Sequence, residues 1–341
     1  MKVQTHTLPR FLWRWLLIAS FVGAACLLSP LRPAPAQQQS NPPGQSARPE
    51  SNNEGKVTVS TEVISLTVSV TDPQGRFISG LEKRAFEVYE NKVAQEISFF
   101  GAEDGPASVG IVFDLSGSMH GEKIRHAQEA LARFIQTCHP EDDYCLIGFN
   151  QRAEVLVEST RDSESLLARL SGIEPRGDTA LYDAVALGLG QVVHGKWPKR
   201  ALIVISDGED NNSRVTFKKI RQMVKEADVT IYTILIKGSM PHGIGQAVLG
   251  TLAETSGGQS FNPENAEQMS EAFEKIALEL RRLYSLGYVP ASFVPDGKWR
   301  KLKVRVTPPP DQPRIVVRTR MGYYAVPDRA RRDQNAAGLD N

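Results

Sequence analysis

The sequence predicts an α/β fold, a doubly wound Rossmann-like domain with a small flanking antiparallel β module. Between residues 108 and 285, apolar strand patterns alternate with helical patterns, as in a parallel sheet covered by helices. On either side, residues 56–101 and 286–325 carry apolar residues at every second position, which is typical of half-buried strands. Because neither flanking segment has many strands, we expect the two to form one β module together.

The composition is that of an ordinary globular protein, since 41% of the 341 residues are hydrophobic and 23% are charged. The formal net charge is +1, from 40 basic and 39 acidic side chains. So balanced a charge gives no reason to expect a nucleic acid as partner. Contact with a membrane is expected only through the N-terminal segment, if that segment is not removed.

Residues 1–36 have the pattern of a secretory signal peptide. Basic residues precede an apolar run of 14 residues from Trp15 to Leu28, and an A-x-A cleavage pattern follows at 34–36. The run is shorter than the roughly 20 residues of a membrane-spanning helix. An uncleaved anchor from Phe11 and lipidation at Cys26, where the usual preceding leucine is missing, are the alternatives. The prediction is export to the periplasm, the cell surface or the medium.

The segments before the α/β region are a polar linker and several strands. Residues 37–55 are rich in Gln, Asn, Pro, Ser and Gly, which is typical of a disordered linker. Strand patterns at 64–70, 86–89 and 97–100 then follow, with a turn signal at 72–75.

Four apolar strand patterns and six helical patterns make up the α/β region. The predicted strands are 109–113, 144–149, 201–205 and 229–236. The predicted helices are 124–135, 163–170, 181–193, 217–227, 246–253 and 267–284. Because the strands are apolar along their whole length, we expect helices on both faces of the sheet.

The strand period returns after this region. Between 301 and 306, apolar residues alternate with Lys301, Lys303 and Arg305, and another strand pattern follows at 315–320. These basic residues could form an anion-binding face, but a solvated face or protection of a sheet edge is the commoner reason for such a row. Residues 326–341 are polar and are predicted to be a disordered tail.

Polar side chains follow two of the buried strands and precede one helix. Asp114, Ser116 and Ser118 follow the first strand, Asp207 follows the third, and Thr179 precedes the helix at 181–193. The carboxyl ends of parallel strands meet at one edge of a sheet, so these side chains should lie together on a rim outside the packed core. Removing the carboxylate of Asp114 or of Asp207 should therefore spare the fold. Carboxylate and hydroxyl oxygens suit Mg²⁺, Mn²⁺ or Ca²⁺, whereas zinc would favour His and Cys.

Each of these residues also has a structural interpretation. Asp207 could end a strand in a turn, Thr179 could cap a helix, and Ser116 and Ser118 could cap the helix that begins near Glu122. Their joint occurrence, in order and at three element ends, favours the metal site. Three further acidic residues in the region are expected on the surface: Asp142, Asp143 and Asp210.

Cys138 and Cys145 flank a short loop between a helix pattern and a strand pattern. In an oxidising compartment they could form a disulfide. Two semi-buried free thiols are an equal alternative, because free cysteines are often buried. No Cys or His spacing indicates zinc or redox catalysis.

The order Asp114-x-Ser116-x-Ser118, followed by Thr179 and Asp207, resembles the metal-ion-dependent adhesion site of von Willebrand factor type A (VWA) domains. The resemblance covers about 108–284 and implies a sheet of about six strands, mostly parallel, with one antiparallel edge strand. It further implies that the serines ligate the metal directly, that the threonine can join them, and that the aspartates often act through water. A Glu or Asp carboxylate from a protein ligand completes the coordination in that family.

The whole chain, with β segments before and after this domain and a Gly322-Tyr323-Tyr324 ending, resembles exported VWFA-related proteins of Acidobacteria. The resemblance implies a non-enzymatic adhesion module or envelope-complex scaffold. A phosphoryl-transfer aspartate at Asp114 would need a second carboxylate two residues on, where Ser116 stands. No nucleophile-elbow or phosphate-loop motif occurs. A metal-dependent hydrolase and an envelope structural protein with an idle metal site remain the alternatives.

Overall fold

The structure is a computed structural model that describes residues 62–101, 104–236, 243–310 and 314–326. The described residues belong to a single unit of the chain, residues 58–341. The expected signal peptide and linker, and all of the expected tail but its first residue, lie outside the described residues. Among the described residues, no helix is long and apolar enough to cross a membrane.

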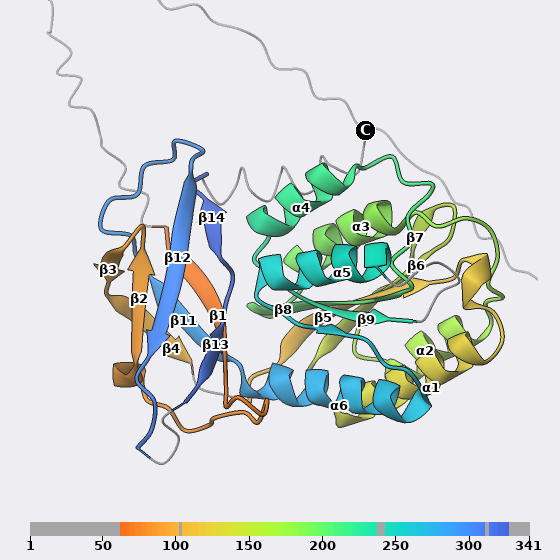
Figure 1. Ribbon diagram of the computed structural model, residues 1–341, viewed down its shortest axis with the longest axis horizontal. Coiled ribbons are helices and arrows are strands. Elements are labelled where there is room, and N and C mark those ends of the chain that lie inside the picture. Colours follow the sequence, from red (N-terminus) through yellow and green to blue (C-terminus); the bar gives the residue numbers. More distant parts are fainter. Residues whose placement is uncertain (1–61, 102–103, 237–242, 311–313, 327–341) are drawn as a thin grey trace, which may run out of the picture. The chain divides into compact units, whose positions relative to one another are not determined.

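A six-stranded sheet forms the middle of the α/β domain, in the order β10-β9-β8-β5-β6-β7 (Figure 1). The strands are β5 (Ala107–Asp114), β6 (Asp143–Phe149), β7 (Ala153–Thr160), β8 (Lys199–Ser206), β9 (Thr230–Leu235) and β10 (Ser260–Phe261). Neighbouring strands run parallel except β6 and β7, which are antiparallel at one edge. The mostly parallel α/β fold predicted from the sequence is therefore confirmed.

Helices cover both faces of this sheet (Figure 1). One face carries α1 (Glu122–Thr137), α2 (Ser163–Ser171) and α6 (Ala266–Arg282), and the other carries α3 (Leu181–Val193), α4 (Phe217–Glu226) and α5 (Gly243–Ser256). Side chains of each strand alternate between the two cores, so that Ile111 faces the α1 side and Val112 faces the α3 side. This double burial explains why the strands are apolar along their whole length.

Three details of the α/β domain differ from the sequence prediction. The edge strand β7 was not predicted, because it is only partly buried and its polar residues do not alternate regularly. Strand β10 has only two residues, too few to leave a pattern. The last helix ends at Arg282 because Leu283 is extended, and strand β11 (Tyr284–Tyr288) begins directly after it.

The flanking segments form two four-stranded sheets, β13-β1-β11-β4 and β14-β12-β2-β3. Their strands are β1 (Ile64–Thr71), β2 (Phe86–Glu90), β3 (Val93–Gln95), β4 (Ile97–Gly101), β11, β12 (Trp299–Val306), β13 (Val316–Arg318) and β14 (Gly322–Tyr324). All pairings are antiparallel, and strands from before the α/β domain pair with strands from after it, as in β1 with β13 and β2 with β12. Residues from both sheets share one hydrophobic core.

A buried carboxylate lies inside this β module. Glu90 accepts hydrogen bonds from the hydroxyls of Tyr288 at 2.6 Å and Tyr323 at 2.8 Å. The three residues come from β2, β11 and β14, so the network connects the two sheets. A satisfied network of this kind fixes how the sheets pack, because a shifted arrangement would leave a buried charge without partners.

The last helix is tied to the β module by a buried ion pair. Glu279 of α6 is 1% exposed, and its carboxylate lies 2.7 Å from the guanidinium of Arg318 on β13. A second pair joins Asp228 to Arg320 at 3.3 Å. The α/β domain and the β module therefore share polar contacts as well as the direct connection from α6 into β11.

Candidate metal centre

The predicted site lies at the carboxyl ends of β5 and β8. These strands are parallel neighbours in which Phe113 pairs with Ile205. The residues that follow the pair, Asp114 and Asp207, are therefore delivered to the same edge of the sheet. Both carboxylates are buried, with Asp114 at 0% and Asp207 at 6% exposure.

The Asp114 carboxylate has two hydrogen-bond donors. Oδ1 accepts from the backbone N–H of Ser116 at 2.8 Å, and Oδ2 accepts from the hydroxyl of Ser206 at 2.6 Å. Burial raises the pKa of Asp114 to about 6, the hydrogen bonds from Ser116 and Ser206 oppose this rise, and the charge of Asp207 adds to it. Ser206 was not recognised in the sequence, although it directly precedes Asp207.

The two serines of the motif connect the strand ends. The Ser118 hydroxyl donates to Asp207 Oδ2 at 2.6 Å, and the Ser116 and Ser118 hydroxyl oxygens lie 3.1 Å apart. Neither side chain caps a helix. The short helix η2 (Gly117–Met119) has no side-chain cap, and α1 begins after Gly121. The capping interpretation of these serines therefore does not describe the structure.

The loop that carries Thr179 lies against the serine loop. The N–H of Gly117 donates to the carbonyl of Gly177 at 3.0 Å. Thr179 is 4% exposed, and its N–H donates to the Asn211 side chain at 2.9 Å. Helix α3 starts after Ala180 without a side-chain cap, so Thr179 does not act as its cap. The structure thus brings all three predicted loops to one rim.

The donor set suits one small divalent cation. Cis ligands at about 2.1 Å from an octahedral ion lie about 3 Å apart. The 3.1 Å between the Ser116 and Ser118 hydroxyls matches that edge. No group of three or more His, Cys, Asp or Glu side chains that could hold a metal occurs among the described residues. A cation here would be held by two carboxylates and three hydroxyls, from Asp114, Ser116, Ser118, Thr179 and Asp207.

The other acidic residues of the region are not ordinary surface groups, so that prediction is wrong. Asp142 and Asp143 are buried at the amino end of β6, where they accept hydrogen bonds from the Ala107 N–H at 2.6 Å and the Ser108 hydroxyl at 2.7 Å. Asp210 is partly buried and accepts from the N–H of Tyr182 at 3.2 Å, in the first turn of α3. All three position loops or strand ends.

The two cysteines are free thiols in the structure. Cys145 packs in the core on the α3 side of the sheet, and Cys138 packs against the core on the α1 side. The sheet therefore separates the two thiols, and the structure does not support the disulfide considered from the sequence. Burial raises the pKa of both thiols to about 12, so they are protonated at neutral pH.

A groove of about 700 Å³ adjoins the rim on its β6 side. Leu115 stands between Asp114 and Ser116 and lines the groove. Its carbonyl accepts the N–H of Arg176 at 2.8 Å. Three exposed arginines line the groove: Arg152, Arg169 and Arg176. In the part of the chain that the structure describes, none of the three makes an ion pair within 4.0 Å.

Comparison with known proteins agrees with this architecture. Residues 109–209 match the family model of the von Willebrand factor type A domain. An uncharacterized Synechocystis protein, sll0103, is 24% identical over 177 residues, which cover 50% of this chain and 41% of that protein. Human inter-alpha-trypsin inhibitor heavy chain H4 is 24% identical over 199 residues, which cover 54% of this chain and 21% of that protein. The chain thus spans less than half the length of these curated relatives.

Solved structures show a similar fold at lower identity. The von Willebrand factor domain of the pilus tip protein Mfa5 from Porphyromonas gingivalis matches 52% of this chain with 14% identity and a TM-score of 0.45. An aerotolerance-related membrane protein from Bacteroides fragilis matches 52% with 18% identity and a TM-score of 0.43. These likenesses concern the fold alone. The comparisons do not support the narrower resemblance to acidobacterial proteins.

Proposed function

We propose that this chain, which contains a von Willebrand factor type A domain, is a non-enzymatic module that binds a protein ligand through a divalent cation. The cation sits where β5 and β8 end, and a Glu or Asp carboxylate of the ligand completes its coordination. The observation that carries the proposal is a chain of three side-chain oxygens, each within hydrogen-bonding distance of the next. The hydroxyls of Ser116 and Ser118 are 3.1 Å apart, and the second is 2.6 Å from Asp207.

The residues have distinct roles in this proposal. Asp114 and Asp207 supply the charge that holds the cation, and Ser116, Ser118 and Thr179 supply neutral oxygens. Ser206 holds the Asp114 carboxylate in place through its 2.6 Å hydrogen bond. Bound Mg²⁺, Mn²⁺ or Ca²⁺ would take at least six oxygen ligands, so these five would leave a position for a carboxylate oxygen of the ligand.

The groove beside the rim gives the ligand a place to lie. Its lining combines apolar side chains, three arginines without ion pairs among the described residues, and two carboxylates, Glu154 and Glu174. Gly148 lets the side chains of Leu115 and Leu156 pack closely over β6, because a Cβ there would lie 2.6 Å from Leu115 and 2.5 Å from Leu156. The groove of about 700 Å³ beside these side chains could take a segment of the ligand next to its ligating carboxylate.

The absence of a second carboxylate beside Asp114 supports a binding role over hydrolysis. Ser116 occupies the position where a phosphoryl-transfer site would need an acid or base. We also propose export through the signal pattern at 1–36, and a role as an adhesion module or as a scaffold of an envelope complex. The cation-dependent contact would then act outside the cytoplasm.

Isothermal titration of the full chain with Mn²⁺ and Mg²⁺ tests cation binding. Asp114→Asn and Asp207→Asn should each weaken binding by about 10- to 100-fold or more, because each removes one of the two charges. Asp162→Asn is the matched control. Asp162 caps α2, Asn is an equally good cap, and the expected affinity is that of the wild type.

Ligand capture and turnover assays separate this proposal from its alternatives. A ligand captured from envelope extract should be released by EDTA and lost with Asp114→Asn. Capture that survives both changes would contradict cation-dependent binding. Cation binding without any cation-dependent ligand would favour an idle site, and turnover of chromogenic phosphate or ester substrates would favour a hydrolase.

A further inference from the structure

A row of six basic side chains runs along α4 and continues along β12, away from the candidate metal centre. The row consists of Lys218, Arg221, Lys225, Lys301, Lys303 and Arg305. The first three are spaced three and four residues apart, so they share one face of α4. The last three occupy alternate positions of one strand, so they share one face of β12.

Trp299 joins the two halves of the row. It precedes Lys301 by two residues and therefore faces the same side of β12. The ammonium of Lys225 lies 5.3 Å from the centre of the Trp299 ring. Helix α4 also packs against β14, the neighbour of β12 (Figure 1). The cations thus follow one continuous path from the helix to the sheet.

The six cations are available to a partner. Five are exposed, and Lys225 is half-buried against Trp299. Within the described ranges, none of the six makes an ion pair within 4.0 Å. The chain as a whole has a net charge of only +1, so a row of this kind is a local concentration of charge.

Edge protection does not explain the whole row. Strand β12 pairs with β14 over Trp299–Lys301 and with β2 over Leu302–Val306. Lysines that protect an edge stand on an unpaired strand, where they deter pairing with another chain. The interpretation as edge protection or a solvated face therefore stays open for Lys303 and Arg305, but edge protection does not account for Lys218, Arg221 and Lys225, which lie on a helix.

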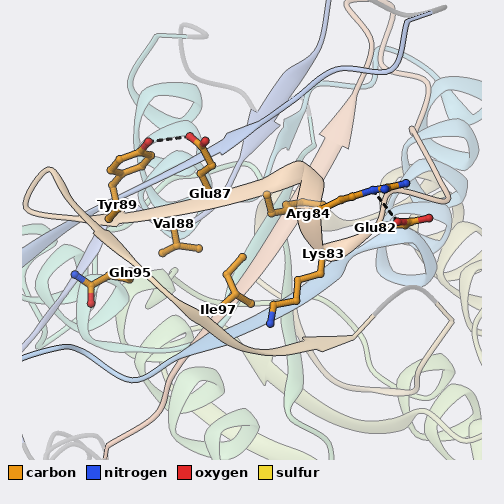
Figure 2. A pocket seen from close by; sticks show the side chains of 10 residues that line it. Glu82, Lys83, Arg84, Glu87, Val88, Tyr89, Gln95 and Ile97 are labelled. Atoms are coloured by element: carbon orange, nitrogen blue, oxygen red, sulfur yellow. Dashed lines mark hydrogen bonds and ion pairs between the residues drawn. The ribbon is translucent and has the colours of Figure 1, made fainter.

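On the sheet, the row of cations is only one strand wide, because it lies on β12 alone. Opposite Arg305 on β2 stands Glu87, and opposite Lys303 stands Tyr89, whose hydroxyl donates to Glu87 at 2.8 Å (Figure 2). On the other side, Lys301 pairs with Gly322 of β14. A flat anionic membrane would meet these neighbours as well as the cations. A line of charge instead fits a linear polymer.

The aromatic rings beside the row are already covered by cations. The guanidinium of Arg305 lies 4.9 Å from the centre of the Tyr89 ring, and Lys225 lies over Trp299. The Trp299 ring also meets Tyr324 edge-on, with ring centres 5.0 Å apart. Single-stranded nucleic acids need open ring faces on which bases can stack. This surface offers charge and no free stacking platform.

We infer that the row Lys218–Arg221–Lys225–Lys301–Lys303–Arg305 binds a linear acidic polysaccharide through its regularly spaced anionic groups. Alternate residues of a strand lie about 6.6 Å apart, and successive turns of a helix about 5.4 Å apart. An extended sugar chain can place its carboxylates or sulfates along such a line. This inference adds a second binding surface to the chain and rests on the proposed export, which would bring it to polymers of this class at cell surfaces.

The test titrates the full chain with polygalacturonate at several salt concentrations. The variant Lys301→Gln/Lys303→Gln/Arg305→Gln should bind about tenfold more weakly or worse. The slope of log affinity against log salt should also fall by about 2, because each contact on a single-stranded polyanion contributes roughly 0.7. The matched control is Arg133→Gln/Arg161→Gln/Lys275→Gln, which removes the same charge from other exposed positions and should bind within twofold of wild type.

Further variants and binding conditions complete the test. Lys218→Gln/Arg221→Gln on α4 should also weaken binding, and it replaces the β12 variant if that variant does not fold. Binding should be unchanged in EDTA and in Asp114→Asn, which distinguishes this surface from the metal centre. Equal loss in the control, no salt-dependent binding to polygalacturonate, or tighter binding to single-stranded DNA or anionic vesicles would overturn the inference.

Discussion

Replacing Asp114 separates two roles of this side chain. From the sequence we expected a carboxylate on a rim outside the packed core, whose removal would spare the fold. In the structure Asp114 is fully buried and accepts hydrogen bonds from the Ser116 N–H at 2.8 Å and the Ser206 hydroxyl at 2.6 Å. Asp114→Ala would leave both donors without their acceptor, so we now expect a loss of stability as well as a loss of cation affinity.

The size of the loss follows from the two broken bonds. A buried polar group that loses its partner costs about 1–3 kcal/mol, so Asp114→Ala should lower the free energy of unfolding by about 2–6 kcal/mol. Asp114→Asn has the same shape. Its oxygen can accept from Ser116, and its amide can donate to the Ser206 hydroxyl, which accepts as well as donates. The amide variant should therefore lose less than about 1.5 kcal/mol.

Urea unfolding in EDTA, followed by circular dichroism, measures stability without a cation. Titration with Mn²⁺ on the same preparations measures affinity. We expect the alanine variant to be clearly less stable than the asparagine variant, and both to bind Mn²⁺ poorly. Equal stability of all three proteins would refute the argument from buried hydrogen bonds. Wild-type Mn²⁺ affinity in Asp114→Asn would refute the argument from charge.

Three other predictions concern stability and thiol chemistry. Arg318→Met should lower the free energy of unfolding by about 3–5 kcal/mol, because Glu279 is left buried without its partner. Breaking the exposed ion pair between Glu122 and Arg125 of α1 should change it by less than about 1 kcal/mol in the same urea assay. Cys138 and Cys145 should resist alkylation in the native protein and react after unfolding; a disulfide between them in mass spectra would contradict this. Burial raises the folded-state pKa of Asp142. The wild type should therefore gain stability relative to Asp142→Asn as pH falls from neutral through that pKa. A difference in free energy of unfolding between the two proteins that stays constant across this pH range would exclude the effect.

The sequence predicted the α/β fold because strands that are covered by helices on both faces consist of apolar residues along their whole length. Strands such as β5 and β8 lie between two layers of helices and are apolar on both faces. The edge strand β7 has helices near only part of its surface, so its residues mix polar and apolar types and leave no period. The end of α6 was missed because a helical pattern of apolar residues continues into β11, where Tyr284 is buried in another core.

The candidate site was predicted through residues that follow strand ends, and its supporting residues were not. Asp114 and Asp207 can be read from their places after buried strands. Ser206 and Asn211 act through side-chain hydrogen bonds to partners 92 and 32 residues away in sequence. The structural role of Asp142 likewise depends on a hydrogen bond from the N–H of Ala107, which is 35 residues away in sequence. Such contacts leave no local pattern, so only the folded chain shows them.

Glycine at position 208 shapes the rim, which gives a last prediction. Gly208 has a φ of +80°, and a Cβ at this position would lie 2.5 Å from the Cα of Gly245 in the first turn of α5. Gly208→Ala adds the strain of a left-handed conformation, about 1–2 kcal/mol, and forces the loop of Asp207 away from α5. The second carboxylate then moves relative to Ser118, to which it is now hydrogen-bonded at 2.6 Å.

The matched control is Gly172→Ala at the end of α2. There φ is −87°, and nothing lies within 4 Å of an added Cβ. Both variants should remain folded in circular dichroism, because both glycines lie on loops. Only Gly208→Ala should lose Mn²⁺ affinity, since cation ligands must be held within a few tenths of an ångström of their productive geometry. If both variants bind Mn²⁺ like the wild type, the close approach of the Asp207 loop to α5 does not position the carboxylate, and the rim tolerates more movement than its hydrogen bonds indicate.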